Sequence, residues 1–551
     1  MKALICALNT KYVHSSLAPW CLLAGVREYA PECECRVVEG TINEEEESIL
    51  NKILENDFEL IGFCTYIWNV QMVLSLAEKI KKRTKATVVL GGPEVSYNAR
   101  EILLKNPFVD LVILGEGERP FAELCVGKAY AEIGGLAYKM GGEVVENEPY
   151  EPLENPPSPY TQEYFSSLGG RISYIETSRG CPYRCAFCLS GRCGGVRFFD
   201  IDEAKANILA LAKSGSKTIK FIDRTFNADK KRAKELFAFI IDNYGDEIPN
   251  GVCFHFEIEG DILDDELICL LSSAPLGSIQ LEIGLQSFNE DTLRAINRKP
   301  NTKRLCENIK KLLKPQNIHI HIDLIAGLPY EDMQSIEESF NRAIALAPHM
   351  LQLGFLKLLY GSELRDKAED YEIEYSRSAP YEVRSTKWLT KAELEALHIT
   401  EDFFDRFYNS GRFLLTTNYI YEKIENPFKI YTELGAFVYE KQQNRSLDEL
   451  SRLVYEYLCA RPELDGERVR DCMALDRLAT NREGSLPEHL RIRTPELRKY
   501  LNMLEENVET RAKKGVKRAI TIMKSEPYAV YVDYDRKNPV TNRYTLKQIK
   551  F

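Results

Sequence analysis

The sequence lacks a long hydrophobic run, a paired set of cysteines and an excess of positive charge. None of its apolar stretches approaches the ~18 residues of a membrane-spanning helix, so we expect no membrane partner. The apolar start, residues 1–8, is too short for a signal peptide and is typical of a first strand. The fifteen cysteines are scattered, which favours a reducing cytoplasm over a disulfide framework. A net charge of −11 argues against nucleic acid as a partner.

A chain of 551 residues with 44% hydrophobic content is expected to fold into two to four domains of mixed α/β class. Residues 1–130 alternate short apolar runs with amphipathic ones, which predicts a doubly wound parallel sheet. Residues 131–169 contain a Gly-Gly hairpin and then a Pro-rich linker. Residues 170–365 again alternate strand and helix. Residues 366–551 form a mostly helical domain with a strand-like segment at 529–533, and we expect its periodic aromatic residues to be core.

Three cysteines, Cys181, Cys185 and Cys188, form a C-x3-C-x2-C triplet after the strand-like residues 171–177. Three thiolates in one loop can hold three irons of a four-iron cluster and leave the fourth iron open. Ordinary ferredoxin sites supply a cysteine for every iron, and structural zinc sites close their coordination shell. A zinc knuckle or a group of buried thiols is the alternative interpretation. We predict that nearby Cys193 is not a ligand, because a fourth thiolate would block the open iron.

With Phe187 just before the last cysteine, this loop resembles that of the radical S-adenosylmethionine (AdoMet) superfamily. The resemblance implies a [4Fe-4S] cluster whose open iron is chelated by AdoMet. Reductive cleavage of AdoMet then yields a 5′-deoxyadenosyl radical. It also implies that residues 170–365 form a partial barrel of six βα units, with the site at the carboxyl ends of its strands.

Residues after the second and third core strands resemble further AdoMet contacts of this superfamily. Residues 221–227 look like the segment that meets the AdoMet amino group, although Asp223, Arg224 and Thr225 replace the Gly-Gly-Glu of other branches. Backbone carbonyls can satisfy the ammonium there. Glu257, near the end of the third strand, is expected to contact the ribose or the methionine part. Pairing of Glu257 with a lysine is the structural alternative.

The spacing of Gln286, Arg298 and Asp323 resembles that of coproporphyrinogen-type radical AdoMet enzymes. By that resemblance Gln286 and Asp323 bind the ribose hydroxyls, and Arg298 pairs with the AdoMet carboxylate. The chemistry agrees, because a guanidinium fork suits a carboxylate and ribose needs hydrogen-bond acceptors. Arg298 could instead cap the helix that begins near residue 290.

The strand ends of residues 1–130 resemble a cobalamin-binding domain that precedes the radical AdoMet core in one large subclass. Paired glycines at such ends let a large flat ligand lie against the backbone. A plain flavodoxin-like sheet is the alternative. The residues expected to contact cobalamin are Thr10, His14, Thr65, Tyr66, Trp68, Gly91, Gly92, Gly115 and Glu116.

One departure from the wider cobalamin-binding pattern concerns the lower face of cobalt. Many such domains carry D-x-H-x-x-G, but residues 9–15 here lack the Asp and the Gly. His14 is therefore either a cobalt ligand or a hydrogen-bonding loop residue, and the second role is favoured. Tyr66 and Trp68 either lie under the corrin ring or pack in the core.

Together the resemblances predict a cobalamin-dependent radical AdoMet enzyme, of a group whose C-terminal domain has no assigned function. We expect it to methylate an unactivated carbon of a small-molecule or peptide substrate, with flavodoxin or ferredoxin as electron donor. The alternatives are a cobalamin-assisted rearrangement or oxidation, a methylthiotransferase-like modification of RNA or protein, and a non-enzymatic sensor. The methylthiotransferase class needs three further N-terminal cysteines in a set that this chain does not have.

Overall fold

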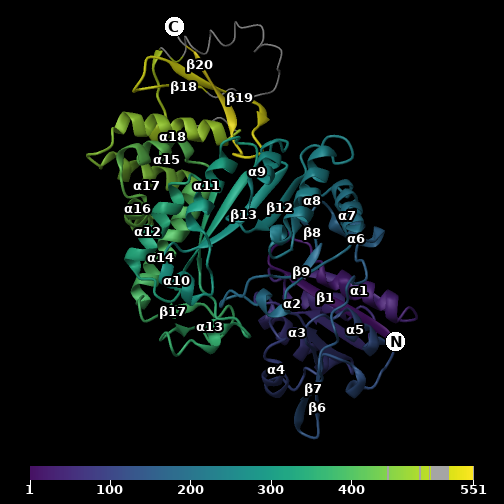
Figure 1. The fold of residues 1–551 in the computed structure, drawn as a ribbon. Helices are drawn as coiled ribbons and strands as arrows, with labels where there is room; N and C mark the ends of the chain where they lie inside the picture. Colours follow the sequence, from purple (N-terminus) through teal and green to yellow (C-terminus); the bar gives the residue numbers. More distant parts are fainter. Residues whose placement is uncertain (443–445, 483–485, 496, 498–519, 550–551) are drawn as a thin grey trace. The chain divides into compact units, whose positions relative to one another are not determined.

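The computed structural model describes residues 1–442, 446–482, 486–495, 497 and 520–549 (Figure 1). These residues form two compact units. The first comprises residues 1–282, 293–301 and 355–387, and the second comprises the described parts of 283–292, 302–354 and 388–551. None of the described helices is long and apolar enough to cross a bilayer.

The chain begins with a seven-stranded sheet of order β2-β1-β3-β4-β5-β6-β7. Strands β1 to β5 are parallel, as predicted, because helical crossovers connect them. The hairpin of β6 and β7 extends the sheet and pairs antiparallel with β5. The bounds are β1 Lys2–Asn9, β2 Glu34–Thr41, β3 Leu60–Cys64, β4 Thr87–Gly91, β5 Leu111–Ile113, β6 Leu136–Met140 and β7 Glu143–Glu146.

Helices cover both faces of this sheet. The apolar faces of α2 (Glu46–Ile53), α3 (Val70–Arg83) and α4 (Ala99–Lys105) share one buried core with the sheet. Helices α1 (Ala18–Tyr29) and α5 (Glu118–Cys125) pack against each other. A Cβ on Gly25 of α1 would lie 2.4 Å from the Glu118 carbonyl oxygen, so only glycine allows this approach.

The first unit also holds the beginning of the second sheet, the one predicted for residues 170–365. Its strands β8 (Ser173–Ile175), β11 (Thr218–Phe221) and β12 (Cys253–Ile258) are parallel neighbours. A two-stranded hairpin of β9 (Ser178–Gly180) and β10 (Val196–Phe198) branches off after β8. Aspartate side chains cap the helices that follow, because their carboxylates accept the free N–H groups of the first turn. These helices are α7 (Ile201–Lys213), α8 (Lys230–Asp242) and α9 (Asp265–Ser272).

The remaining core strands are β13 (Ile279–Gln286), β14 (His319–Ala326) and β15 (Met350–Phe355), in sequential order. Their connecting helices are α10 (Glu290–Ala295), α11 (Thr302–Leu313) and α12 (Met333–Ile344). The six strands predicted for residues 170–365 are therefore present.

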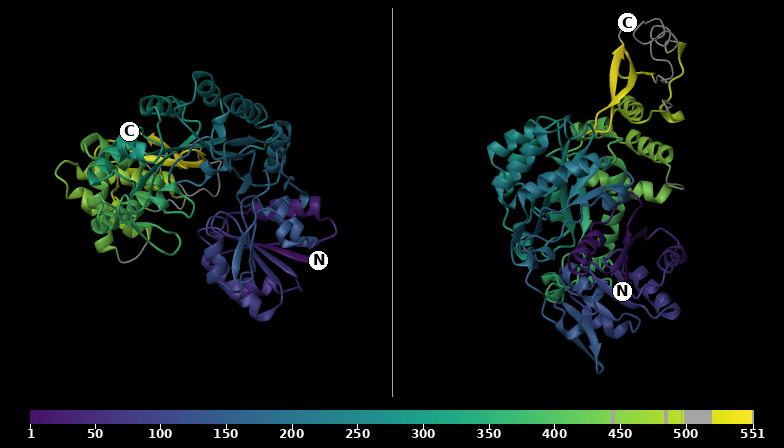
Figure 2. Two further views of the ribbon diagram at one scale, coloured as in Figure 1. Left: turned by 60° about the horizontal axis from the view of Figure 1, so that its bottom comes forward. Right: turned by 90° about the vertical axis from the view of Figure 1, so that its right-hand side faces the viewer.

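Helices dominate the second unit after β15, as expected from the sequence (Figure 2). Their bounds are α14 Lys391–Phe404, α15 Leu414–Lys423, α16 Pro427–Lys441, α17 Leu447–Cys459 and α18 Gly466–Thr480. The aromatic side chains Phe403, Phe404, Phe407 and Phe413 are each at most 4% exposed, which confirms that they are core.

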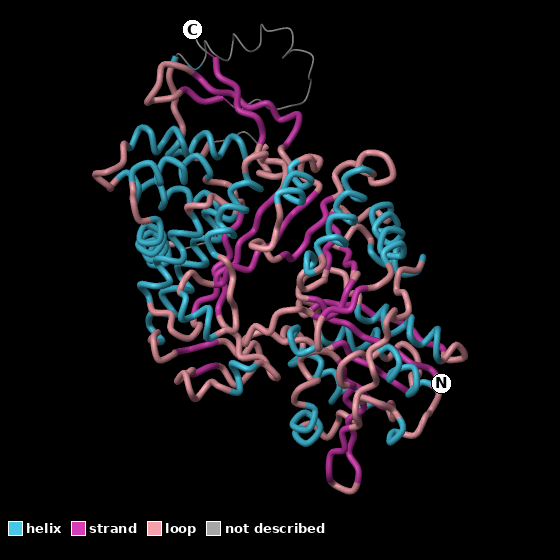
Figure 3. The backbone as a smooth tube through the Cα atoms, viewed as in Figure 1, coloured by secondary structure: helices cyan, strands magenta, loops and turns pink. Residues whose placement is uncertain are grey.

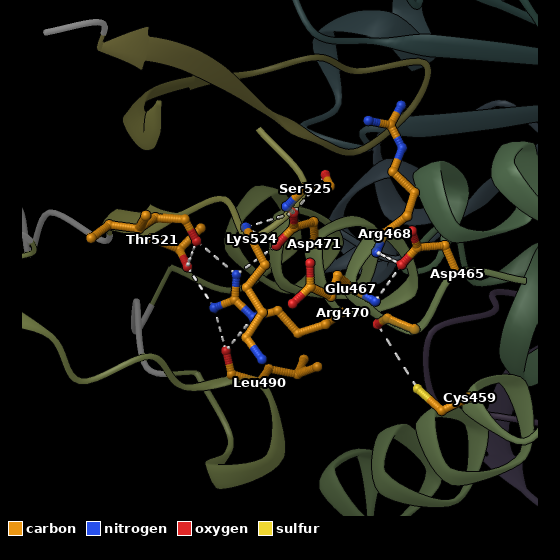
Figure 4. Close-up of polar contacts among 12 residues, drawn as sticks. Cys459, Asp465, Glu467, Arg468, Arg470, Asp471, Leu490, Thr521, Lys524 and Ser525 are labelled. Atoms are coloured by element: carbon orange, nitrogen blue, oxygen red, sulfur yellow. Dashed lines mark hydrogen bonds and ion pairs between the residues drawn. The ribbon is translucent and has the colours of Figure 1, made fainter. Parts of the chain in front are cut away.

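The described chain ends in a small antiparallel sheet of β18 (Ile520–Ile522), β19 (Ala529–Lys537) and β20 (Tyr544–Ile549), drawn as magenta strands in Figure 3. Two buried, paired residues of α18 hold it (Figure 4). Arg470 donates to the Thr521 hydroxyl and the Ile522 carbonyl. Asp471 accepts from the amides of Lys524 and Ser525.

Candidate active site

The cysteine triplet lies on one half-buried loop after β9, and all three thiols are free. The amide of Cys188 donates to the carbonyl of Cys185 at 3.0 Å. Between them, the main chain of Ala186 donates to Ile296 and accepts from Leu364, at 3.0 and 2.9 Å. Neighbouring segments therefore fix the loop, and its donor set fits three irons of a four-iron cluster. Phe187 is half-buried within this loop, and the side chain of Cys193 lies outside what the structure describes.

Polar groups surround the thiols. The hydroxyl of Thr225 lies 3.3 Å from Sγ of Cys181. Nη1 of Arg298 donates to Sγ of Cys185 at 3.7 Å. Burial raises the pKa of the Cys185 thiol, and the Arg298 charge opposes that rise. A bound cation is therefore the natural way to keep this buried cysteine as a thiolate.

A buried ion pair next to the triplet was missed in the sequence. Nη2 of Arg298 lies 2.8 Å from Oε2 of Glu259, and both side chains are largely buried. Burial raises the pKa of Glu259, and Arg298 opposes it. The predicted contact Glu257 lies instead 4.0 Å from Nη1 of Arg224. Strand β12 ends at residue 258, so Glu259 is the first residue beyond the strand end, and that position was the signal in the sequence.

The side chain of Asp223 is fully engaged within the fold. It accepts from the amide and hydroxyl of Thr177, at 3.0 and 2.6 Å, and from the Ser178 hydroxyl at 2.6 Å. Because it is 1% exposed, it anchors the chain that leads into the cysteine loop. Any contact of this segment with a ligand therefore falls to its backbone and to the side chains of Arg224 and Thr225.

The two predicted ribose-binding residues, Gln286 and Asp323, belong to the second unit. Gln286 ends β13 with a φ of 70°, a conformation that non-glycine residues rarely adopt. Its Oε1 atom is buried and accepts no hydrogen bond from the described residues. Oδ1 of Asp323 lies 3.0 Å from Nε2 of His321. A strained backbone and an orphaned buried acceptor in Gln286 fit a ligand-binding position.

The first unit contains a cavity of about 580 Å³ at the carboxyl ends of β1, β3, β4 and β5. Residues around β8, β9 and β11 of the core form its other wall. Most of the predicted cobalamin contacts line it, namely Thr10, His14, Tyr66, Trp68, Gly91, Gly92, Gly115 and Glu116. Thr65 is fully buried, and its amide donates to the Gly91 carbonyl at 2.7 Å.

The deep end of the cavity is apolar, and glycines shape its rim. A Cβ on Gly115 would meet nothing within 4 Å, so space is open above that backbone. A Cβ on Gly62 would lie 2.6 Å from the Phe121 ring, which closes the floor. An open glycine rim over an apolar floor fits a large ring with a tail. The apolar lining residues are Leu17, Leu22, Val89, Ile113 and Phe121.

Three candidates for the lower face of cobalt line this cavity. Nδ1 of His14 lies 2.7 Å from the Tyr174 hydroxyl, which supports the hydrogen-bonding role. Burial lowers the pKa of His14. The rings of Tyr66 and Trp68 stack at 4.4 Å between centroids with 5° between their planes. Trp68 is 42% exposed and its indole N–H donates to the Leu8 carbonyl at 3.0 Å, so a flat aromatic platform faces the cavity.

An ionic cluster joins the two walls of the cavity. Arg179, just before the cysteine loop, contacts Glu116 at 2.8 Å, Glu118 at 2.6 Å and Glu176 at 2.9 Å. Arg197 makes a second contact with Glu116 at 2.5 Å. The predicted cobalamin contact Glu116 is therefore an acceptor for two arginines of the core. Only the folded structure brings these residues together, because the arginines follow the carboxylates of the first sheet by more than 60 residues.

Comparison with known families assigns three parts of the chain. Residues 4–125 match the B12 binding domain, residues 175–343 match the radical SAM superfamily, and residues 369–535 match a protein of unknown function, DUF4080. The cavity therefore lies between the ligand-binding ends of the first two matched regions.

Two curated relatives and one solved structure illustrate the similarity. The 2-(S-pantetheinyl)-carbapenam-3-carboxylate methyltransferase of Streptantibioticus cattleyicolor is 26% identical over 60% of this chain and 52% of its own. The cobalamin-dependent radical SAM methyltransferase TokK of Streptomyces tokunonensis is 26% identical over 54% of this chain and 47% of its own. The chain thus spans about half the length of these relatives.

The fold is similar to that of the cobalamin-dependent S-adenosylmethionine radical enzyme OxsB, solved with aqua-cobalamin and S-adenosylmethionine. The TM-score is 0.57 at 14% identity, over 93% of this chain and 81% of the other. The chain therefore combines a B12 binding region, a radical SAM region and a region that matches DUF4080, and the cavity and the cysteine triplet lie within the first two.

Proposed function

We propose that the protein is a methyltransferase that acts on an unactivated carbon of a small-molecule or peptide substrate. The observation that carries the proposal is the cavity of about 580 Å³, whose walls come from the B12-binding sheet and from the strand ends beside the cysteine loop. A substrate there would have both cofactors within reach. Two relatives of this chain are methyltransferases, which supports methylation as the reaction.

When bound, the cluster with AdoMet would supply a 5′-deoxyadenosyl radical and methylcobalamin would supply the methyl group. The chain's own part is to bind, orient and exclude water. Cys181, Cys185 and Cys188 hold the cluster. Glu259 and Arg298 offer a carboxylate and a guanidinium side by side, which suits the ammonium and carboxylate of a methionine moiety.

The remaining predicted residues have positioning roles in this proposal. Gln286 and Asp323 would accept hydrogen bonds from the ribose of AdoMet, and Thr225 would support the cluster through its contact with Cys181. The glycine rim at Gly91, Gly92 and Gly115 would carry the corrin. The cluster needs an electron from a small carrier such as flavodoxin or ferredoxin. An oxygen-sensitive cluster and free thiols suit the cytoplasm.

Anaerobic reconstitution with iron, sulfide, hydroxocobalamin and AdoMet tests the proposal. We expect 5′-deoxyadenosine on reduction, and its loss when any cysteine of the triplet is replaced by Ala. With AdoMet carrying a deuterated methyl group, mass spectrometry of the products should show the label in substrate. Deoxyadenosine that forms with the true substrate but without label transfer would contradict methylation and leave a radical rearrangement or oxidation.

A further inference from the structure

Arg224 follows β11 and lines the cavity from the side of the core. Its side chain is 55% exposed, and its nearest carboxylate, Glu257, is 4.0 Å away. That distance is too long for a hydrogen bond. Within the described part of the chain its guanidinium donates no hydrogen bond, so its donors stay available to a ligand.

The position of Arg224 relates it to both cofactor sites. The next residue, Thr225, has its hydroxyl 3.3 Å from Sγ of Cys181. On the other side, Arg224 lies close enough to Tyr66 to influence it. Burial raises the pKa of the Tyr66 phenol, and the charge of Arg224 opposes that rise. Arg224 therefore stands on the wall between the cluster loop and the aromatic platform.

The second arginine of the cavity, Arg179, differs in this respect. Three carboxylates, Glu116, Glu118 and Glu176, contact it within 3 Å and neutralise it. Arg179 is thus committed to the fold, whereas Arg224 presents a charge to the cavity. Because the Arg224 side chain is 55% exposed and its ion-pair partner Glu257 lies 4.0 Å away, an anion can reach the guanidinium without breaking a hydrogen bond.

We propose that Arg224 binds an anionic group of the substrate, a carboxylate or a phosphate, and so selects anionic substrates. This inference rests on the proposed function, since it takes the substrate to lie between the cluster loop and the cobalamin cavity. The guanidinium fork matches either group with two parallel hydrogen bonds. Anchoring one end of the substrate fixes which carbon faces the radical.

The test uses reconstituted full-length protein and a small-molecule extract of the source cells. The extract is divided by ion exchange into anionic, cationic and neutral fractions, and each is assayed for stimulation of 5′-deoxyadenosine formation. We expect the anionic fraction alone to stimulate. Phosphatase treatment then separates the sources, because it abolishes stimulation by a phosphate ester and spares a carboxylate.

Variants connect the effect to Arg224. R224Q should need roughly 10- to 100-fold more of the active fraction than the wild type for the same stimulation, the loss expected when charge-assisted hydrogen bonds are removed. R224K keeps the charge and should need less of the fraction than R224Q does. K213Q is the matched control, because Lys213 on α7 is similarly exposed (53%) but lies outside the cavity. Binding without turnover is measured by ultrafiltration of the active compound together with protein to which no AdoMet has been added. R224Q should retain less of the compound than the wild type does.

Three results would overturn the inference. The first is that the cationic or neutral fraction stimulates deoxyadenosine formation, or that no fraction does. The second is that R224Q and the wild type respond equally to the active fraction. The third is that R224Q fails to take up hydroxocobalamin, which would assign Arg224 to cobalamin binding. The proposed function fails separately. If deoxyadenosine formation responds as expected but no labelled methyl group reaches the product, anion binding by Arg224 stands and methyl transfer does not.

Discussion

The hydroxyl of Ser287 donates a 2.5 Å hydrogen bond to Oε1 of Glu331, and both residues are almost fully buried. The same hydroxyl accepts from the Asn289 amide at 3.0 Å, and the Phe288 amide donates to Ser339 at 3.0 Å. This network fixes the turn immediately after Gln286, whose backbone is held at a positive φ. Glu331 therefore helps to position Gln286, a predicted AdoMet contact.

Glu331 also makes stability depend on pH. Burial raises its pKa to about 8, with a smaller contribution from nearby Asp332. An unfolded glutamate titrates near ~4.3, so the folded state binds the extra proton between about pH 4.3 and 8. The contribution of the neutral Glu331 carboxyl to the free energy of unfolding is fully present below that window and is lost as the pH rises through it. Each pH unit within the window lowers the free energy of unfolding by about 1.4 kcal/mol.

We therefore expect E331Q to become more stable relative to the wild type as the pH rises from 6 to 8. The difference between their thermal midpoints, measured by differential scanning calorimetry, should increase by several degrees. E338Q is the control, since Glu338 is exposed on α12, the helix that begins two residues after Glu331. A difference that does not change with pH would mean that Glu331 is ionised in the folded protein.

A second prediction separates the two glutamates at the end of β12. E259Q should raise the KM for AdoMet roughly 10- to 100-fold, because it removes one charge of the buried pair with Arg298. E257Q should change that KM by less than about threefold, because the Glu257 carboxylate lies 4.0 Å from Nη1 of Arg224 and is 37% exposed, whereas Glu259 is buried. The assay is deoxyadenosine formation at varied AdoMet. The reverse order of effects would favour Glu257 over Glu259 as the AdoMet contact.

The glycine rim offers a third prediction. Gly92 lines the cavity, but it is not a clean probe of cobalamin binding. The structure gives Gly92 a φ of 113°, and its Cβ would lie 2.5 Å from the Thr65 carbonyl oxygen, so G92V would distort the loop itself. Gly91 lines the cavity, and its Cβ would make only ordinary contacts, the closest at 3.7 Å.

We therefore expect G91V to lower hydroxocobalamin uptake at least tenfold while its thermal midpoint changes little. Uptake is measured by absorbance after anaerobic gel filtration. T87V, at the opposite end of the same strand and outside the cavity, should bind cobalamin normally. Normal uptake by G91V would place the corrin elsewhere.

The sequence predicted the features that depend on local patterns. The five parallel strands of the first sheet follow from short apolar runs, and the cluster loop follows from cysteine spacing. Features built from distant segments could not be predicted. Glu94, for example, accepts a hydrogen bond from the Tyr381 hydroxyl, 287 residues away. The pairing of Glu259 with Arg298 likewise depends on which of two nearby glutamates turns toward the loop.

A fourth prediction concerns Cys193, whose side chain lies outside the described structure. C193A should keep the absorbance of the cluster and about four irons per chain, because the open iron must stay free for AdoMet. Iron analysis after reconstitution, beside C188A as the cluster-deficient reference, decides the matter. Loss of iron in C193A comparable to that in C188A would make Cys193 a ligand.

The last prediction concerns the pairing of Arg470 and Asp471 on α18 (Figure 4). Arg470 is 1% exposed and, besides Asp471 at 2.9 Å, binds the Thr521 hydroxyl at 2.7 Å and the Ile522 carbonyl at 2.8 Å. R470A would leave a buried carboxylate without its cation, at a cost of about 3–5 kcal/mol.

Because the lost contacts hold β18, we expect the backbone amides of β18, β19 and β20 to exchange hydrogen much faster in R470A. Mass spectrometry after deuterium labelling measures this, with the N-terminal sheet as the internal reference. R468A is the matched control, since Arg468 lies on the same helix with its side chain 43% exposed, and surface substitutions change stability by about 0.5 kcal/mol or less. Unchanged exchange in R470A would mean that apolar packing alone keeps the C-terminal sheet on α18.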